Sequence, residues 1–164
     1  MNLKTAEAAV GGLSRPSKMP TFGWSISASR CGVGARLALI PGTVCAECYA
    51  LRGRYTFPNV RAALERRFNA WAGDRAAWVA NMVYIMNHKK AIIDSGVFRW
   101  FDSGDIQGAP MLADIIAIAE GAPAVRFWVP TKEYALIRDN LKPIPQNLII
   151  RVSNPNINAN TLKG

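Results

Sequence analysis

All three cysteines of the 164-residue chain lie within one short stretch, from Cys31 to Cys48. Thirteen residues separate Cys31 from Cys45, and two separate Cys45 from Cys48. A Cys-x-x-Cys pair places two sulfurs near one metal centre, and a third thiolate from the preceding glycine-rich loop completes three corners of a tetrahedron. Three thiolates with an open fourth position suit an iron–sulfur cluster of the four-iron, four-sulfur (4Fe–4S) type, or a zinc ion with one other ligand.

A simpler interpretation of the cysteines is that they are buried thiols that pack as small apolar side chains. Their clustering argues against it, because the other 146 residues contain no cysteine. The odd number of cysteines and the close spacing of Cys45 and Cys48 also argue against a disulfide framework. The pattern therefore favours a reducing compartment, and we expect a cytoplasmic protein.

The net charge of +9 is concentrated in the first part of the chain. Residues 1–72 hold ten Lys and Arg against three acidic residues, whereas residues 73–164 hold ten against eight. Such a basic half attracts nucleic acid or another anionic partner, although a solvated basic surface explains it equally well. The first ten residues lack the apolar core of a signal peptide, and no apolar run approaches the roughly 18 residues of a membrane span. We expect no membrane association.

The composition is that of one globular domain, since half of the residues are apolar and 19% are charged. Residues 1–20 contain two prolines and a Gly-Gly pair without a clear period, which predicts a loosely packed N-terminal arm before a single α/β domain over 21–164. Residues 21–27 alternate between apolar and polar, as a strand does. Pro58 suits the start of a helix, and Asp74 suits the N-cap of the next one.

The second half of the chain alternates strand and helix patterns. Apolar strand patterns cover residues 97–101, 125–129 and 148–152, and between them lie helical patterns at 112–119 and from Thr131, as cap, to about Asn140. This order predicts parallel neighbouring strands joined by right-handed crossovers. About four strands are visible, fewer than the eight of a closed barrel, so we expect a partial, truncated TIM-like barrel. Its open edge favours a homo-oligomer.

Polar residues follow each of these strands. The second strand runs into Asp102-Ser103-Gly104-Asp105, and the third runs into Pro130-Thr131-Lys132-Glu133. Parallel α/β sheets bind ligands at the carboxyl ends of their strands. We therefore predict a cofactor site beside the cysteine segment, made of Ser103, Gly104, Asp105, Thr131 and Lys132. An Asp-Ser-Gly-Asp run is equally well explained as a turn with an N-cap.

Each strand of the second half also holds one arginine, namely Arg99, Arg126 and Arg151. These residues have apolar neighbours, so the sheet is expected to have one face that is not purely hydrophobic. A half-open barrel lumen would have this character. The alternative is that the stems lie along apolar surface while the charged heads reach solvent.

Residues 41–55, 98–105 and 127–133 resemble the bacteriophage gene-product-88-like proteins. The order of cysteines after the first strand and a Gly-containing acidic turn after the next is also similar to radical S-adenosylmethionine enzymes. This resemblance implies an iron–sulfur cluster on the three cysteines and a ligand, S-adenosylmethionine among the candidates, near Ser103, Gly104 and Asp105. It also implies a location in the host-cell cytoplasm. The thirteen-residue gap after Cys31 differs from the three residues usual in the radical enzymes.

Three functions remain open at this point. The first is a 4Fe–4S protein whose open iron faces residues 102–105. The second is a zinc-stabilised module with Asp102, Asp105 or His88 as the fourth ligand. The third is a non-enzymatic protein that binds nucleic acid weakly, or a host protein, through basic and aromatic residues of the N-terminal half: Tyr49, Arg52, Arg54, Tyr55, Arg61, Arg66 and Arg67. The sequence names no substrate and no reaction.

Overall fold

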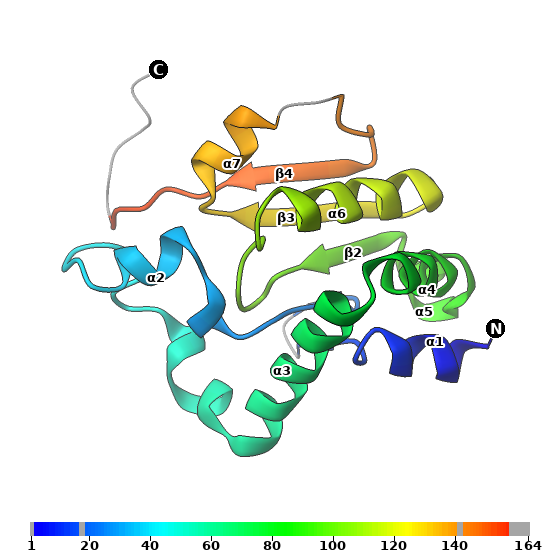
Figure 1. Cartoon of the computed structure of the whole chain (residues 1–164), viewed down its shortest axis with the longest axis horizontal. Helices are drawn as coiled ribbons and strands as arrows, with labels where there is room; N and C mark the ends of the chain where they lie inside the picture. Colours follow the sequence, from blue (N-terminus) through cyan, green and yellow to red (C-terminus); the bar gives the residue numbers. More distant parts are fainter. Residues whose placement is uncertain (1, 17–18, 141–142, 158–164) are drawn as a thin grey trace.

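Four parallel strands, in sequence order, form the central sheet of the protein. The computed structural model describes residues 2–16, 19–140 and 143–157. The strands are β1 (Gly23–Trp24), β2 (Val97–Trp100), β3 (Arg126–Thr131) and β4 (Leu148–Val152). Each pairs in parallel with the next, and in Figure 1 the labelled strands point the same way. The prediction of parallel neighbouring strands is confirmed.

The sheet is open rather than closed into a barrel. Among the described residues no strand pairs with the outer edge of β4. At the other edge Ser14 forms an antiparallel bridge with Gly23, so the N-terminal segment covers β1 at this point. The structure therefore shows a mixed α/β fold with an open four-stranded sheet, and the expected TIM-like barrel is not shown. β1 has two residues where seven were expected.

Local capping signals set the helix boundaries in the middle of the chain. Pro58 begins α3 (Pro58–Gly73), as expected from its fixed φ. The Asp74 carboxylate accepts a hydrogen bond of 3.0 Å from the Ala77 N–H and so caps α4 (Arg75–His88). The other long helix is α6 (Ala109–Gly121), and short helices are α5 (Lys90–Ser95) and α7 (Tyr134–Asp139).

Thr131 is not the cap of the last helix. It lies inside β3, and Glu133 is the N-cap of α7. The Thr131 hydroxyl instead donates to the Asp105 carboxylate and accepts from the Glu133 N–H. The strand therefore extends further than its apolar residues indicated, because a polar tertiary contact holds its last residue.

The N-terminal segment is packed, in contrast to the loosely packed arm that we expected. Residues Leu3–Ala9 form α1, and the Asn2 side chain caps it. Ala6 and Val10 are fully buried. The Trp24 indole N–H donates to the Val10 carbonyl at 2.9 Å. Alanine has the highest helix propensity, and α1 contains three alanines. Their small side chains let α1 pack closely against α4.

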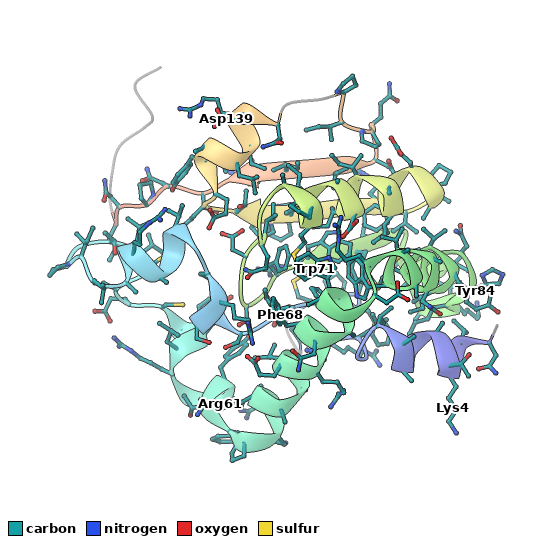
Figure 2. The ribbon with its side chains drawn as sticks, in the orientation of Figure 1. Lys4, Arg61, Phe68, Trp71, Tyr84 and Asp139 are labelled. Carbon is teal, nitrogen blue, oxygen red and sulfur yellow. The ribbon has the colours of Figure 1, made fainter. Side chains whose placement is uncertain are left out.

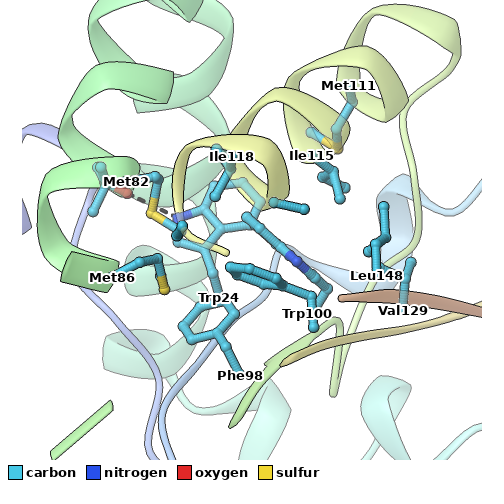
Figure 3. Packing of buried hydrophobic residues seen from close by; sticks show 14 of the residues in the cluster. Trp24, Met82, Met86, Phe98, Trp100, Met111, Ile115, Ile118, Val129 and Leu148 are labelled. Carbon is cyan, nitrogen blue, oxygen red and sulfur yellow. Dashed lines mark hydrogen bonds between the residues drawn. The ribbon is translucent and has the colours of Figure 1, made fainter. Parts of the chain in front are cut away.

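The core lies on one face of the sheet. Phe98 and Trp100 of β2 and Val129 of β3 point toward α4 and α6, as Figure 3 shows. The indoles of Trp24 and Trp100 form an edge-to-face pair with centroids 6.1 Å apart, and Phe98 packs edge-to-face on Trp100 at 5.2 Å. Aromatic rings of this kind dominate the burial that stabilises a small domain.

The opposite face of the sheet carries the arginines. Arg99, Trp128 and Ile149 lie in one row by register, on the side away from the buried aromatic residues. Trp128 is 36% exposed and Ile149 is 46% exposed. The Arg99 guanidinium lies over the Trp128 ring at 4.7 Å. Arg126 and Arg151 are exposed too, so this face is not purely hydrophobic, as expected.

Short helical turns form the segment between β1 and α3 that holds the cysteines. They are η1 (Ala28–Arg30), α2 (Val33–Leu37), η2 (Tyr49–Leu51) and η3 (Gly53–Thr56). A bridge between Thr43 and Asn156 joins this segment to the chain that follows β4. In Figure 1, α2 lies beyond the arrowheads of the strands, so the cysteine segment sits at the carboxyl edge of the sheet.

Candidate functional site

A pocket of about 270 Å³ opens at the carboxyl ends of the strands. It brings together all eight residues that the sequence assigned to a metal or cofactor: Cys31, Cys45, Cys48, Ser103, Gly104, Asp105, Thr131 and Lys132. Carboxyl edges of parallel sheets are the usual place for ligands, because the loops that leave neighbouring strands converge there. What these residues bind stays a prediction, since their proximity does not name the ligand.

The three cysteines are free and half-buried. Cys31 follows η1, whereas Cys45 and Cys48 precede η2. Gly34 of α2 lies against them: a Cβ placed there would be 3.6 Å from the Sγ atoms of both Cys31 and Cys45, and 3.1 Å from the Cys31 Cβ. Glycine at this position therefore leaves space beside two sulfurs that any other residue would partly fill.

The surroundings of Cys31 and Cys45 favour the protonated form of these two thiols when no cation is present. Burial raises the pKa of Cys31 to about 12, and the negative charges of Asp105 and of the other two cysteines act in the same direction. Burial also raises the pKa of Cys45, while the positive charge of Lys132 opposes that shift. A metal bound here would have to displace these protons, as metals do at thiolate sites.

Asp105 connects the end of β2 to the end of β3. Its buried carboxylate accepts hydrogen bonds from the Thr131 hydroxyl at 2.6 Å, the Lys132 N–H at 2.8 Å and the Ile106 N–H at 2.8 Å. Burial raises the pKa of Asp105, and these three hydrogen bonds oppose the shift. Both carboxylate oxygens are engaged, so the geometry makes Asp105 a residue that positions Thr131 and Lys132.

Ser103 differs from Asp105 because its hydroxyl is unused. The side chain is 3% exposed, and its Oγ has no hydrogen-bond partner among the described residues. A buried hydroxyl without a partner is uncommon and points to a group that the protein structure alone does not supply. Because Ser103 lines the pocket, its Oγ is available to a ligand there.

Gly104 has a steric role. Its φ is +81°, and a Cβ at this position would lie 2.4 Å from Ile26 Cγ1 and 2.8 Å from the Ile26 carbonyl oxygen. Only glycine fits such a backbone without strain. The glycine of the Asp-Ser-Gly-Asp run is thus required by the turn, as the alternative interpretation of this motif states. The N-cap in that interpretation is wrong, because the helix that follows, α6, begins after Gly108 without a side-chain cap.

Three residues that the sequence did not assign to the metal or cofactor site add contacts at or beside the pocket, and of these Tyr49 lines it. Tyr49 follows Cys48 directly, and its hydroxyl donates to the Asp102 carbonyl. The Tyr55 hydroxyl donates to the Asp102 carboxylate at 2.8 Å. Glu133 accepts a hydrogen bond of 2.7 Å from the Val33 N–H and so ties the start of α7 to α2. The sequence had assigned Tyr49 and Tyr55 to the binding of nucleic acid or a host protein, whereas Glu133 had no predicted role at the site.

His88 lies away from the pocket. Its ring stacks on Tyr84 with centroids 4.0 Å apart at the end of α4. In residues 2–16, 19–140 and 143–157, no group of three or more His, Cys, Asp or Glu side chains is arranged to hold a metal ion.

Residues 5–163 match the protein family described as Gene product 88. The chain belongs to the Gene product 88 family. This is the family indicated by the motifs at 41–55, 98–105 and 127–133, and the match covers both the cysteine segment and the strand ends. It gives no support to the likeness with radical S-adenosylmethionine enzymes. No curated protein and no solved structure matches this Gene product 88 chain. Within its described residues, no helix is long and apolar enough to cross a bilayer.

Proposed function

We propose that this protein binds a 4Fe–4S cluster through Cys31, Cys45 and Cys48. The observation that carries the proposal is the position of three free thiols on one pocket at the carboxyl edge of a parallel sheet. Cysteine thiolates are the usual ligands of such clusters. The missing Cβ of Gly34 leaves space next to two of the sulfurs, which suits a bulky inorganic group.

A cluster and a single zinc ion require different arrangements of the three thiols. In a cluster each thiolate binds a different iron, so the three sulfurs stand farther apart than they do around one ion. Three cysteines also leave one iron for a ligand other than cysteine, and a bound cluster would supply one-electron redox chemistry at that point.

The other pocket residues have distinct roles in this proposal. Lys132 places a positive charge near Cys45 and favours its thiolate form, which partly offsets the negative charge of three thiolates. Ser103 offers an unused hydroxyl to a ligand in the pocket. Asp105 holds the ends of β2 and β3 in register, so that Lys132 and Ser103 stay at the same rim.

The test is metal and sulfide analysis of protein purified without oxygen. We expect about four irons and four sulfides per chain in the wild type, and loss of most of both in Cys31→Ser, Cys45→Ser and Cys48→Ser. Ala35→Ser, an exposed change in α2, is the matched control and should keep the full iron content. Full iron in the cysteine variants would refute the proposal. One zinc without sulfide would instead establish the zinc-stabilised module.

S-adenosylmethionine, the ligand implied by the sequence resemblance, is a separate prediction. The pocket volume, about 270 Å³, lies just below the range for small-molecule sites, about 300–1,000 Å³. Adding S-adenosylmethionine to cluster-loaded protein should change the electron paramagnetic resonance spectrum of the reduced cluster if the ligand reaches the open iron. An unchanged spectrum would refute the binding of S-adenosylmethionine to the open iron, without affecting the proposal that the protein binds a cluster.

A further inference from the structure

A second and larger cavity, of about 900 Å³, adjoins the cysteine pocket. The two share Tyr49, Arg99 and Asp102 as lining residues. The walls of the second cavity come from the N-terminal segment, from η3, from α3 and from β2. Its volume lies within the range of small-molecule sites, about 300–1,000 Å³. The proposed cluster does not account for this cavity, because no cysteine lines it.

Four arginines from four separate parts of the chain line this cavity: Arg15, Arg54, Arg67 and Arg99. None of them forms an ion pair with a residue that the structure describes. Asp102 is the one acidic residue among the described lining residues, and its carboxylate is engaged by the hydroxyls of Ser25 and Tyr55. The cavity is therefore strongly positive.

Arg67 shows the excess of positive charge in the cavity most clearly, since this residue is only 8% exposed. Its Nε donates to the Gly12 carbonyl at 3.1 Å, and its second terminal nitrogen donates to the Leu13 carbonyl at 2.9 Å. Both acceptors are neutral. Burial lowers the pKa of Arg67, and the negative charge of Asp102 opposes that shift. One carboxylate serves four lining arginines, so an additional anion in this cavity would find a favourable site.

Two buried donors in the same cavity have no acceptor. The Nε of Arg99 and the Oγ of Ser14 are buried, and neither has a hydrogen-bond partner among the described residues. One terminal nitrogen of Arg99 reaches the Met19 sulfur at 3.4 Å, which is a weak acceptor, and the guanidinium also contacts the Tyr49 side chain. Buried polar groups are nearly always paired, so these donors indicate an acceptor that a ligand supplies.

We propose that this cavity binds a nucleoside phosphate. Guanidinium groups match phosphate oxygens with two parallel hydrogen bonds, and four of them suit a ligand with more than one negative charge. The Tyr49 ring is 61% exposed and meets Tyr55 edge-to-face at 5.7 Å, which leaves an aromatic face for a base. Apolar side chains complete the wall: Leu13, Pro16, Val60, Ala63 and Leu64.

Isothermal titration calorimetry with the four ribonucleoside diphosphates tests this assignment. At least one should bind the wild type with a Kd below about 1 mM, and about tenfold more tightly than either inorganic pyrophosphate or the free nucleoside. Arg54→Ala should weaken that binding about tenfold, because it removes a charge-assisted contact. Among the described residues the Arg54 side chain makes no hydrogen bond or ion pair, so its loss should not impair folding.

Arg61→Ala is the matched control. Arg61 lies on the same α3 side of the molecule, is exposed and does not line the cavity (Figure 2). It should change the Kd less than twofold, which separates cavity binding from general attraction to a basic surface. Diphosphate binding should also persist in Cys45→Ser. The test of the nucleoside phosphate site is therefore independent of the test of cluster binding.

Three results would overturn the assignment. The first is no binding of any diphosphate at about 1 mM. The second is an equal loss of affinity in Arg54→Ala and Arg61→Ala, since that would mean surface charge alone attracts the ligand. The third is binding of a single-stranded deoxythymidine oligomer without binding of any diphosphate, which would make the cavity part of a nucleic-acid groove.

Discussion

Gly104 shows how one residue of a candidate site can be required by geometry alone. Its Cβ would overlap with Ile26, whose backbone cannot move without disturbing the β1 end. We therefore expect Gly104→Ala to lower the free energy of unfolding by about 3 kcal/mol or more. Gly53→Ala is the control: its φ is +57°, but nothing lies within 4 Å, so only about 1–2 kcal/mol of backbone strain is expected. Urea denaturation measures both, and equal losses would contradict this account.

Cys31 offers a second test at the residue scale, on metal-free protein. A thiol reacts with iodoacetamide as its thiolate, and the pKa of Cys31 is raised to about 12 by burial and by neighbouring negative charge. Its alkylation rate should therefore still rise about tenfold per pH unit between about pH 8 and pH 10, whereas an ordinary thiol levels off above about pH 8.5. Peptide mass spectrometry gives the rate for each cysteine. A plateau for Cys31 near pH 9 would mean that this thiol is not shielded as the structure indicates.

Asp105 acts at the scale of elements, because it joins two strand ends. Asp105→Asn keeps the shape but replaces one accepting oxygen with an amide that cannot accept from the Lys132 or Ile106 N–H. Loss of a buried hydrogen bond to a charged group costs about 1.5–3 kcal/mol, so we expect a decrease of that size in the free energy of unfolding.

Asp139→Asn is the control for this change. Asp139 pairs with its neighbour Arg138 at the surface of α7, and exposed ion pairs contribute little. A change of less than about 0.5 kcal/mol is expected there. If the two variants lost equal stability in urea, the connection between β2 and β3 would not be the role of Asp105.

At the scale of the whole molecule, the sheet leaves an edge and a face uncovered. The outer edge of β4 has no strand partner among the described residues, and Trp128 and Ile149 are exposed on the face that the helices do not cover. Unpaired strand edges and exposed apolar residues both promote association. The homo-oligomer expected from the sequence stays a prediction. The structure identifies the outer edge of β4 and the face with Trp128 and Ile149 as the surface through which copies would associate.

Sedimentation velocity over a range of concentrations tests it. We expect a dimer or larger species for the wild type, and a shift toward monomer for Ile149→Lys. Ile93→Lys is the matched control, since Ile93 is 51% exposed on α5, outside the sheet. A monomer at all concentrations, or an equal effect of the two changes, would show that this face does not mediate association.

The sequence by itself determined several element boundaries from Pro58 onward. β4 has the predicted bounds, and α3 and α4 begin at the predicted Pro58 and Asp74 signals, because apolar periodicity and capping are local properties of the chain. It also placed Cys31, Cys45 and Cys48 next to the strand ends, since parallel strands must present their carboxyl ends at one edge. The family indicated by its motifs is the one that matches.

Only the tertiary structure decided which polar groups of these residues have hydrogen-bond partners and which do not. Asp105 and Ser103 are two positions apart, yet one is fully engaged by Thr131 and Lys132 and the other has an unused hydroxyl. The arginine-lined cavity depends on contacts such as that between Arg67 and the Leu13 carbonyl, 54 positions apart. Local patterns cannot encode such pairings, because they arise only when helices and strands pack together and decide which polar groups find partners.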